Sequence, residues 1–308
     1  MPDTEPEAQP PRRITPLEMP AVSVRDGLRF PLTRDQLAAR VREALEEDGA
    51  FNDITTIATV RSDRRARAAL VARQGGTVAG IPFALETFRT LDPKVSMRVD
   101  TEDGKRAMRG ETIIYITGHA RAMLSAERVA LNFLMRLSGI ATLTSRFVDA
   151  VRGTGAKILD TRKTTPGWRL LEKYAVRAGG GTNHRMDLAS SVLIKDNHLA
   201  AVDGRVDIAV RRARELAPPG ATIEVECISA DQVAAAVASG ADIVLLDNMP
   251  PDLMRECVKL TAKRALLEAS GGVTLENVRS VAETGVDMIS VGALTHSAAA
   301  LNLALDFE

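Results

Sequence analysis

Cationic side chains gather in one segment of this 308-residue chain, residues 161–198. Arg162 is followed directly by Lys163, His184 by Arg185, and Lys195 lies shortly after them, with three glycines at 179–181. A solvated helix face would space its charges three or four residues apart, which these adjacent pairs do not do. Arg offers a two-pronged fork for carboxylate or phosphate, and Lys a point charge. The segment therefore predicts a site for a small anion with several carboxylates or phosphates.

Two carboxylates occupy alternate positions of a strand-like run, TIEVEC at 222–227. Glu224 and Glu226 project to one side of such a strand. A buried carboxylate without a partner is costly, so we expect each to pair with Lys195 or Lys163, or to meet a metal ion or ligand hydroxyls. Asp247 ends the next strand-like run. Carboxylates with open coordination suit Mg²⁺ held mainly by substrate phosphates, and a structural Lys–Glu pair is the alternative.

Glycine-rich turns follow the last two strand-like runs of the chain. Ser270, Gly271 and Gly272 follow one run, and Gly292, Ala293 and Leu294 the other. Glycines let backbone N–H groups approach a phosphate closely, and loops after the last strands of α/β barrels often bind one. No Ser-His-Asp set or reactive cysteine is indicated, so charge stabilisation fits better than covalent catalysis.

After Gly155, short apolar runs alternate with helical patterns such as 230–238 and 276–283. Repeated βα units predict a parallel sheet, and here an α/β barrel. Nearly every run ends in a polar residue or glycine, at the edge where α/β barrels carry their chemistry. The expected strands are 156–161, 192–196, 222–227, 242–247, 265–270 and 288–293.

The first half has an α+β pattern with antiparallel strands expected at 67–73, 95–99 and 112–117. A helical pattern from about residue 30 gives way to a turn-like stretch at 52–56. A long helix is expected over 125–150, with a possible interruption at Ser138-Gly139. Arg128 and Asn132 share one face of this helix, and the stripe of Val129, Phe133 and Leu137 is core.

Composition excludes several classes of protein. Acidic and basic residues balance at 40 each and aromatics make up 3%, which argues against a nucleic-acid binder. Cys227 and Cys257 are too few for a metal cluster or disulfide frame, so a reducing cytoplasm is expected. No apolar run reaches membrane-span length, and the acidic, proline-rich first residues predict a disordered tail, not a signal peptide.

The motifs together resemble the quinolinate phosphoribosyltransferase family, the carboxylating nicotinate-nucleotide pyrophosphorylases of NAD biosynthesis. The resemblance covers nearly all of the chain after the tail, and Asp187 stands where glycine is more usual. Its motifs are NDITT (52–56), GGTVAGI (75–81), SAERVALNFLMRLSGIAT (125–142), DTRKTTPGWRLLEKYAVRAGGGTNHR (160–185), LIKDNH (193–198), EVE (224–226), LLDNM (245–249), EASGGV (268–273) and SVGAL (290–294).

The resemblance implies two domains after a tail at 1–28. These are an N-terminal α/β sandwich at 29–137, which could also receive residues 296–308, and an incomplete, open α/β barrel at 138–295. It implies a cytoplasmic homodimer with the active site at the shared boundary. The reaction would join quinolinate to phosphoribosyl pyrophosphate and yield nicotinate mononucleotide, CO₂ and pyrophosphate.

The resemblance also implies residue roles. Arg128, supplied by the partner subunit, would surround the quinolinate carboxylates together with Arg162, His184 and Arg185. Lys163 and Lys195 would serve the carboxylates and the pyrophosphate, with Thr161 as a further substrate-binding residue. Glu224 and Asp247 would hold the ribose hydroxyls and Mg²⁺, and with the two lysines form the catalytic set. The segments Ser270 to Gly272 and Gly292 to Leu294 would cradle the 5-phosphate.

Two alternatives remain. A paralogue of the same fold could serve molybdate uptake or another phosphoribosyl acceptor, against which the combination TRKT, NHR and LIKDNH argues. A binding or regulatory protein could keep the basic cleft without turnover. The strand-end carboxylates Glu224 and Asp247, alongside Lys163 and Lys195, argue against that role, because an anion sensor does not need them.

Overall fold

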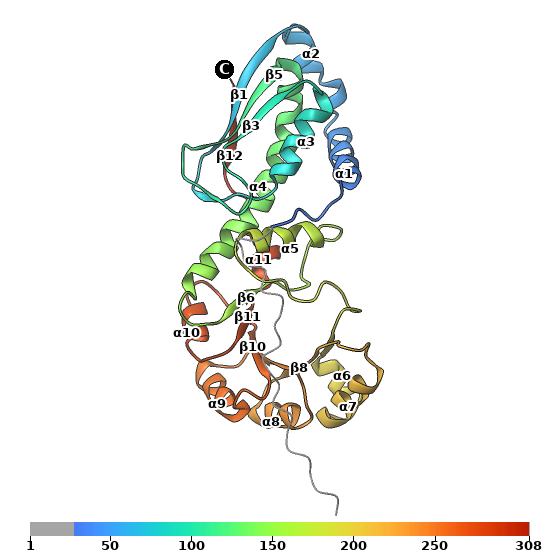
Figure 1. The fold of residues 1–308 in the computed structure, drawn as a ribbon, viewed down its shortest axis with the longest axis vertical. Helices are drawn as coiled ribbons and strands as arrows, with labels where there is room; N and C mark the ends of the chain where they lie inside the picture. Colours follow the sequence, from blue (N-terminus) through green and yellow to red (C-terminus); the bar gives the residue numbers. More distant parts are fainter. Residues whose placement is uncertain (1–27, 308) are drawn as a thin grey trace, which may run out of the picture.

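The computed structural model describes residues 28–307, so all but the last residue of the tail predicted at 1–28 lies outside the described residues. Figure 1 shows two layered parts joined end to end by one long helix, α4 (Ala120–Ala150). The N-terminal part carries an antiparallel sheet, and the other part carries a parallel sheet ringed by helices. No helix among the described residues is long and apolar enough to cross a membrane.

The N-terminal sheet has the strand order β12-β1-β5-β3, and all its pairs are antiparallel. The last strand of the chain, β12, pairs with β1, so C-terminal residues complete this sheet. Helices α3 and α4 contact each other beside the sheet, and α1 packs on α3 (Figure 1). The elements are α1 (Arg34–Glu47), η1 (Ala50–Asn52), α2 (Ile54–Thr59), β1 (Arg65–Ala72), β2 (Gly76–Thr77), α3 (Ile81–Leu91), β3 (Ser96–Val99), β4 (Arg106–Ala107), β5 (Thr112–His119) and β12 (Leu303–Phe307).

Two local predictions in this half are wrong. The stretch 52–56 is not a turn, because the Asp53 side chain accepts a hydrogen bond from the Thr56 N–H at 3.0 Å and caps helix α2. Helix α4 is not interrupted at Ser138-Gly139. The Ser138 hydroxyl bonds the backbone of Ala79, and a Cβ on Gly139 would lie 2.1 Å from the Ala299 carbonyl oxygen. These small residues serve close packing instead of ending the helix.

The second part confirms the predicted open α/β barrel. Its six strands are all parallel, in the order β6-β11-β10-β9-β8-β7. Among the described residues the edge strands β6 and β7 do not pair with each other, and Thr182 forms a single bridge to Leu159 of β6. All six expected strands form, and each is shorter than expected: β6 (Lys157–Leu159), β7 (Val192–Ile194), β8 (Ile223–Cys227), β9 (Ile243–Asp247), β10 (Leu266–Ser270) and β11 (Met288–Ser290).

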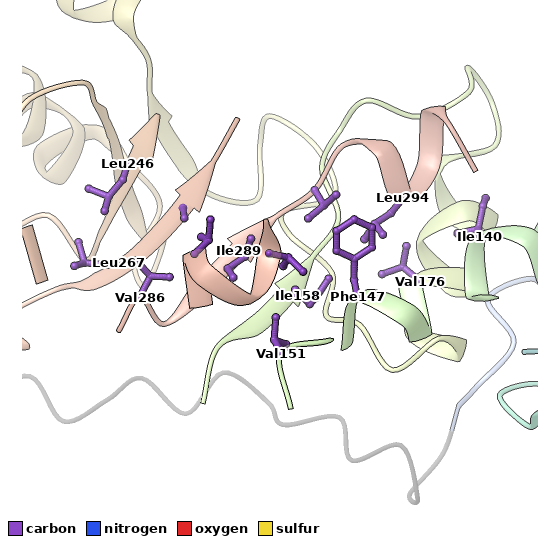
Figure 2. Close-up of a cluster of buried hydrophobic side chains, with 14 of the residues drawn as sticks. Ile140, Phe147, Val151, Ile158, Val176, Leu246, Leu267, Val286, Ile289 and Leu294 are labelled. Carbon is purple, nitrogen blue, oxygen red and sulfur yellow. The ribbon is translucent and has the colours of Figure 1, made fainter. Parts of the chain in front are cut away.

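Side chains alternate along these strands between an outward, core-facing side and an inward side that faces the site. Leu246, Leu267 and Ile289 point outward and pack with residues of the surrounding elements (Figure 2). Burying each such side chain contributes roughly 1.5–3 kcal/mol. The intervening positions face inward and carry the polar residues of the site. The helices are α5 (Arg169–Ala178), α6 (Asp196–Ala200), α7 (Val206–Leu216), α8 (Ala230–Ala238), α9 (Pro251–Thr261), α10 (Val278–Ala282) and α11 (Ala293–His296).

Candidate active site

A cleft of about 660 Å³ opens at the carboxyl ends of the barrel strands. Its walls are the segments that follow β6, β7, β9, β10 and β11, together with the 184–185 turn. The cleft brings together most of the residues predicted from sequence, namely Thr161, Arg162, Lys163, His184, Arg185, Lys195, Asp247, Ser270, Gly271, Gly272, Gly292 and Ala293.

The turn that carries His184 and Arg185 is anchored by the buried Asp160. The Asp160 carboxylate accepts hydrogen bonds from the Asn183 side chain at 2.5 Å and the His184 N–H at 2.9 Å, and it pairs with Lys173. Burial raises the pKa of Asp160 and lowers that of Lys173, while each partner favours the charged form of the other. This fully buried pair therefore fixes the cationic turn to the barrel.

The segment after β6 is anchored by a second buried carboxylate, Glu172 of α5. Glu172 accepts hydrogen bonds from the Thr165 N–H at 3.1 Å and the Thr165 hydroxyl at 2.9 Å. The Thr295 hydroxyl donates to the Lys163 carbonyl at 2.7 Å. The Arg162-Lys163 segment is thus held on its C-terminal side by residues of α5 and α11.

The carboxylates of the cleft are Glu226, Asp247 and Glu268. Lys195 lies 3.1 Å from Glu226, one of the pairs expected from the sequence. The Asn248 side chain donates to Asp247 at 3.0 Å, from a backbone with a φ of 52°. In such a cleft Lys195 can neutralise a leaving phosphate group, and the carboxylates of Glu226 and Asp247 can hold sugar hydroxyls.

The structure corrects the joint assignment of Glu224 and Asp247. Glu224 pairs in register with Ile243, four residues before Asp247 on β9, so the two carboxylates differ in depth by about 13 Å. Glu224 lines a separate inner cavity of about 340 Å³, and its partner is His184 Nε2 at 3.2 Å instead of a lysine. The sequence predicts the inward face of Glu224 and Glu226, but not which of them reaches the cleft.

His184 lies between two buried carboxylates. Its Nε2 is 3.2 Å from Glu224 and 3.4 Å from Glu268, and these side chains are 3% and 1% exposed. Burial lowers the pKa of His184, and the two neighbouring carboxylates raise it. The Arg185 N–H, however, donates to Nδ1 at 2.7 Å, which places the ring proton on Nε2.

A metal does not fit this cluster, although His184, Glu224 and Glu268 present three potential ligands within 4.8 Å of one another. A histidine ligates through an unprotonated nitrogen, and Nε2 carries the proton here. Two carboxylates this close favour binding of one proton between them, and we infer that Glu224 and Glu268 share it. Burial and the neighbouring Glu268 accordingly raise the pKa of Glu224.

Glycines at the ends of β10 and β11 form part of the cleft wall. Gly271 has a φ of +90°, and a Cβ there would lie 2.2 Å from the Asn248 side-chain oxygen. A Cβ on Gly292 would lie 3.1 Å from His296 Nε2 and 3.2 Å from Lys163 Cδ. Side chains at these positions would intrude into the cleft, so the glycines leave backbone exposed to a phosphate-sized anion.

Besides Glu224, two further predicted site residues do not line the cleft. Leu294 is fully buried in the hydrophobic core, because its side chain points away from the turn (Figure 2). Arg128 is exposed on α4, eight residues before Arg136, which reaches the barrel at the Thr295 carbonyl. Eight residues of helix span about 12 Å, so Arg128 lies on the N-terminal part, well away from the cleft.

Sequence reasoning missed Glu268 and His296, and it named Glu226 without assigning it to the site. Both Glu268 and His296 line the cleft. A signal for Glu268 was present, because an acidic residue inside the apolar run LLEAS shares the inward face of Ser270 two positions later. His296 lies in a short helix whose sequence carries no comparable pattern.

Comparisons with known proteins agree along nearly the whole chain. Residues 53–138 match the family "Quinolinate phosphoribosyl transferase, N-terminal domain", and residues 140–306 match its C-terminal domain. The chain is 44% identical over 271 residues to the probable nicotinate-nucleotide pyrophosphorylase [carboxylating] of Bacillus subtilis, covering 88% of this chain and 93% of that protein. The Mycobacterium leprae nicotinate-nucleotide pyrophosphorylase [carboxylating] is 47% identical over 274 residues, covering 86% and 95%.

A solved structure shows the same fold. The crystal structure of NadC from Streptococcus pyogenes superposes with a TM-score of 0.86 at 38% identity, covering 91% of this chain and all of that one.

Proposed function

The chain belongs to the quinolinate phosphoribosyltransferase family, and we propose that the cleft at the strand ends is the active site in which it works. It is a carboxylating nicotinate-nucleotide pyrophosphorylase of NAD biosynthesis. It transfers the phosphoribosyl group of phosphoribosyl pyrophosphate to quinolinate, with loss of CO₂, and yields nicotinate mononucleotide and pyrophosphate.

The observation that carries the site assignment is that cations and glycine turns line one and the same cleft. Arg162, His184 and Arg185 line it together with the Ser270 to Gly272 turn and Gly292. Guanidinium groups bind carboxylates through two parallel hydrogen bonds, which suits the two carboxylates of quinolinate. The glycine turns suit the 5-phosphate of the sugar donor.

Lys163 and Lys195 line the same cleft and would face the leaving pyrophosphate. Asp247 is the residue that would hold Mg²⁺, because one carboxylate plus substrate oxygens is a coordination shell that this ion accepts. When bound, Mg²⁺ would supply charge neutralisation at the pyrophosphate. Glu226 replaces Glu224 in the proposed contact with the ribose hydroxyls, because only Glu226 lines the cleft.

Charge stabilisation accounts for the chemistry. Positive charge develops at ribose C1 as pyrophosphate leaves, and the Asp247 and Glu226 carboxylates stabilise it. The pyridine nitrogen then attacks and becomes cationic, which eases loss of the adjacent carboxylate. Arg162 and Arg185 orient the dicarboxylate for this attack.

We further propose a homodimer that shares its active sites. Arg128 is exposed on α4 and lies outside the cleft of its own chain, so a second copy would have to supply it. A cytoplasmic setting is also proposed, because both cysteines, Cys227 and Cys257, are buried free thiols.

One assay tests the proposed site and activity. Purified protein is incubated with quinolinate, phosphoribosyl pyrophosphate and Mg²⁺, and nicotinate mononucleotide and CO₂ are measured. Arg162→Ala should abolish turnover, whereas Arg211→Ala on the exposed side of α7 should not. Full activity of the Arg162 variant would refute the site assignment.

A further inference from the structure

The decarboxylation requires a proton donor, which the cations of the cleft do not provide. Loss of CO₂ from the cationic pyridine ring leaves an electron pair on the ring carbon, and that carbon must gain a proton. Resting on the proposed function, we propose that Glu268, in the buried cluster of Glu224, His184 and Glu268, is the acid that delivers this proton.

Position selects Glu268 for this role. Glu268 lies two residues before Ser270 on β10, about 7 Å deeper in the barrel, so it forms part of the cleft floor. Glu268, His184 and Arg185 each line both the cleft and the inner cavity. The junction of the two spaces therefore lies beside the cationic turn and below the Ser270 to Gly272 turn.

Unsatisfied atoms at this junction point to a ligand. Both carboxyl oxygens of Glu268 and Oε1 of Glu224 are buried without a hydrogen-bond partner. A buried polar atom without a partner costs about 1–3 kcal/mol, which is tolerated where function uses it. The inner cavity behind them is lined in part by the apolar side chains of Leu159, Ile243 and Leu266.

The cluster holds one transferable proton. With the Arg185 N–H at Nδ1, the His184 ring is satisfied as a neutral donor through Nε2. Two buried carboxylates this close cannot both ionise readily, so they share a proton. The other charged groups facing them are the Arg185 side chain and Asp242, and Asp242 is occupied by the Ile223 N–H at 2.7 Å and by Arg214 at 3.0 Å.

Other cleft groups are poorer donors. Arg162 and Arg185 do not give up a proton in proteins. Lys195 is already paired with Glu226 at 3.1 Å. A carboxylic acid kept neutral by its neighbour is a stronger acid than either, and it matches the task of a single proton transfer.

The step balances within the cluster. The C–CO₂ bond breaks and its electron pair stays on the ring carbon. The ring carbon then uses this electron pair to form a C–H bond as the O–H bond of Glu268 breaks. The products are the protonated ring carbon of nicotinate mononucleotide, CO₂ and a Glu268 carboxylate. His184 Nε2–H and Glu224 stabilise the new carboxylate, and water restores the proton after product release.

Single-turnover kinetics of Glu268→Gln test the role. The amide keeps the shape of the side chain but carries no acidic proton. Pyrophosphate should form at close to the wild-type rate, whereas CO₂ and nicotinate mononucleotide should form about 100-fold more slowly, because general acids contribute factors of that order. Quinolinate mononucleotide should accumulate. Equal rates of pyrophosphate and CO₂ formation, whether at wild-type speed or lost together, would overturn the proposal.

Further variants separate this role from packing. Glu268→Asp keeps the acid one methylene away and should retain more CO₂ formation than Glu268→Gln, and equal behaviour of the two would overturn the proposal. Met288→Leu, in the same inner cavity, conserves volume and should match wild type. Thermal melts report whether each variant folds. Wild-type protein that forms no nicotinate mononucleotide would instead refute the proposed function.

Discussion

Arg136 of α4 donates to Glu172 of α5 at 2.6 Å, and the same guanidinium donates to the Thr295 carbonyl at 2.6 Å. Glu172 is fully buried and also holds Thr165, beside the Arg162-Lys163 segment. One ion pair therefore ties the helix that spans both parts of the molecule to the anion-binding segment. Breaking the Arg136–Glu172 pair should therefore both destabilise the fold and disturb the anion-binding segment.

Breaking this pair should destabilise the protein strongly. Arg136→Ala leaves the Glu172 carboxylate buried without its cation, which costs about 3–5 kcal/mol. Urea unfolding followed by circular dichroism measures the loss. Arg279→Ala is the matched control, because its pair with Glu283 is about half exposed on both sides and such pairs contribute about 0.3–0.5 kcal/mol. Similar losses for the two variants would contradict the argument.

Substrate choice should follow the number of carboxylates. Several cations line the cleft, and one lost charge-assisted contact costs about 1.5–3 kcal/mol. Quinolinate should therefore be used with a kcat/KM well above that of nicotinate. Comparable kcat/KM values for the two acids would count against the pocket assignment.

Depth in the barrel should separate the two glutamates of β8. Glu226→Gln and Asp247→Ala should each lower the rate of pyrophosphate formation, because their carboxylates line the cleft. Glu224→Gln should affect that step much less, because Glu224 lies in the inner cavity. Quenched time courses of pyrophosphate formation distinguish the variants. A greater loss of rate for Glu224→Gln than for Glu226→Gln would reverse the assignment.

Metal removal tests the proposed role of Asp247. Complete chelation of divalent ions with EDTA should abolish turnover, and added Mg²⁺ should restore it. Asp247→Ala should need more Mg²⁺ for half-maximal rate while its melting curve stays near wild type, since the side chain is half-buried at a strand end. Unchanged turnover after metal removal would refute this role.

The sequence predicts the strands better than the depth of their side chains. Alternation in TIEVEC places Glu224 and Glu226 on one face, and the structure bears out the strand itself. Which glutamate reaches the cleft depends on the register with β9, where Glu226 lies opposite Leu245 and Glu224 opposite Ile243. That register is a tertiary property, set by neighbouring strands.

Close packing explains the other mismatch. Ser138 and Gly139 have the composition of a helix break, yet α4 continues through them. The backbone at Ala299, distant in sequence, lies against Gly139, and no local pattern announces that contact. Leu294 likewise follows the glycine turn predicted to bind phosphate, but its side chain is buried in the hydrophobic core.

Stability should depend on pH through Glu224. Burial and Glu268 raise its pKa above the ordinary 4.5, so the folded state holds the proton more tightly than the unfolded state. The free energy of unfolding should therefore fall as pH rises from about 4.5 towards the folded pKa, by at most about 1.4 kcal/mol per pH unit for one proton. Glu224→Gln should flatten this decline. Urea titrations between pH 4.5 and 8 measure it, and parallel slopes for both proteins would contradict the prediction.

The position of Arg128 makes the shared site testable by complementation. Arg128 lies outside the cleft of its own chain, whereas Arg162 lines it. If a partner supplies Arg128, then Arg128→Ala and Arg162→Ala should each be nearly inactive alone. After subunit exchange, a mixed dimer has one site free of both substitutions and one site that carries both. Roughly half the dimers are mixed, so activity should recover to about one quarter of wild type. Exchange confirmed by mass-tagged subunits without such recovery would show that Arg128 does not act across a dimer interface.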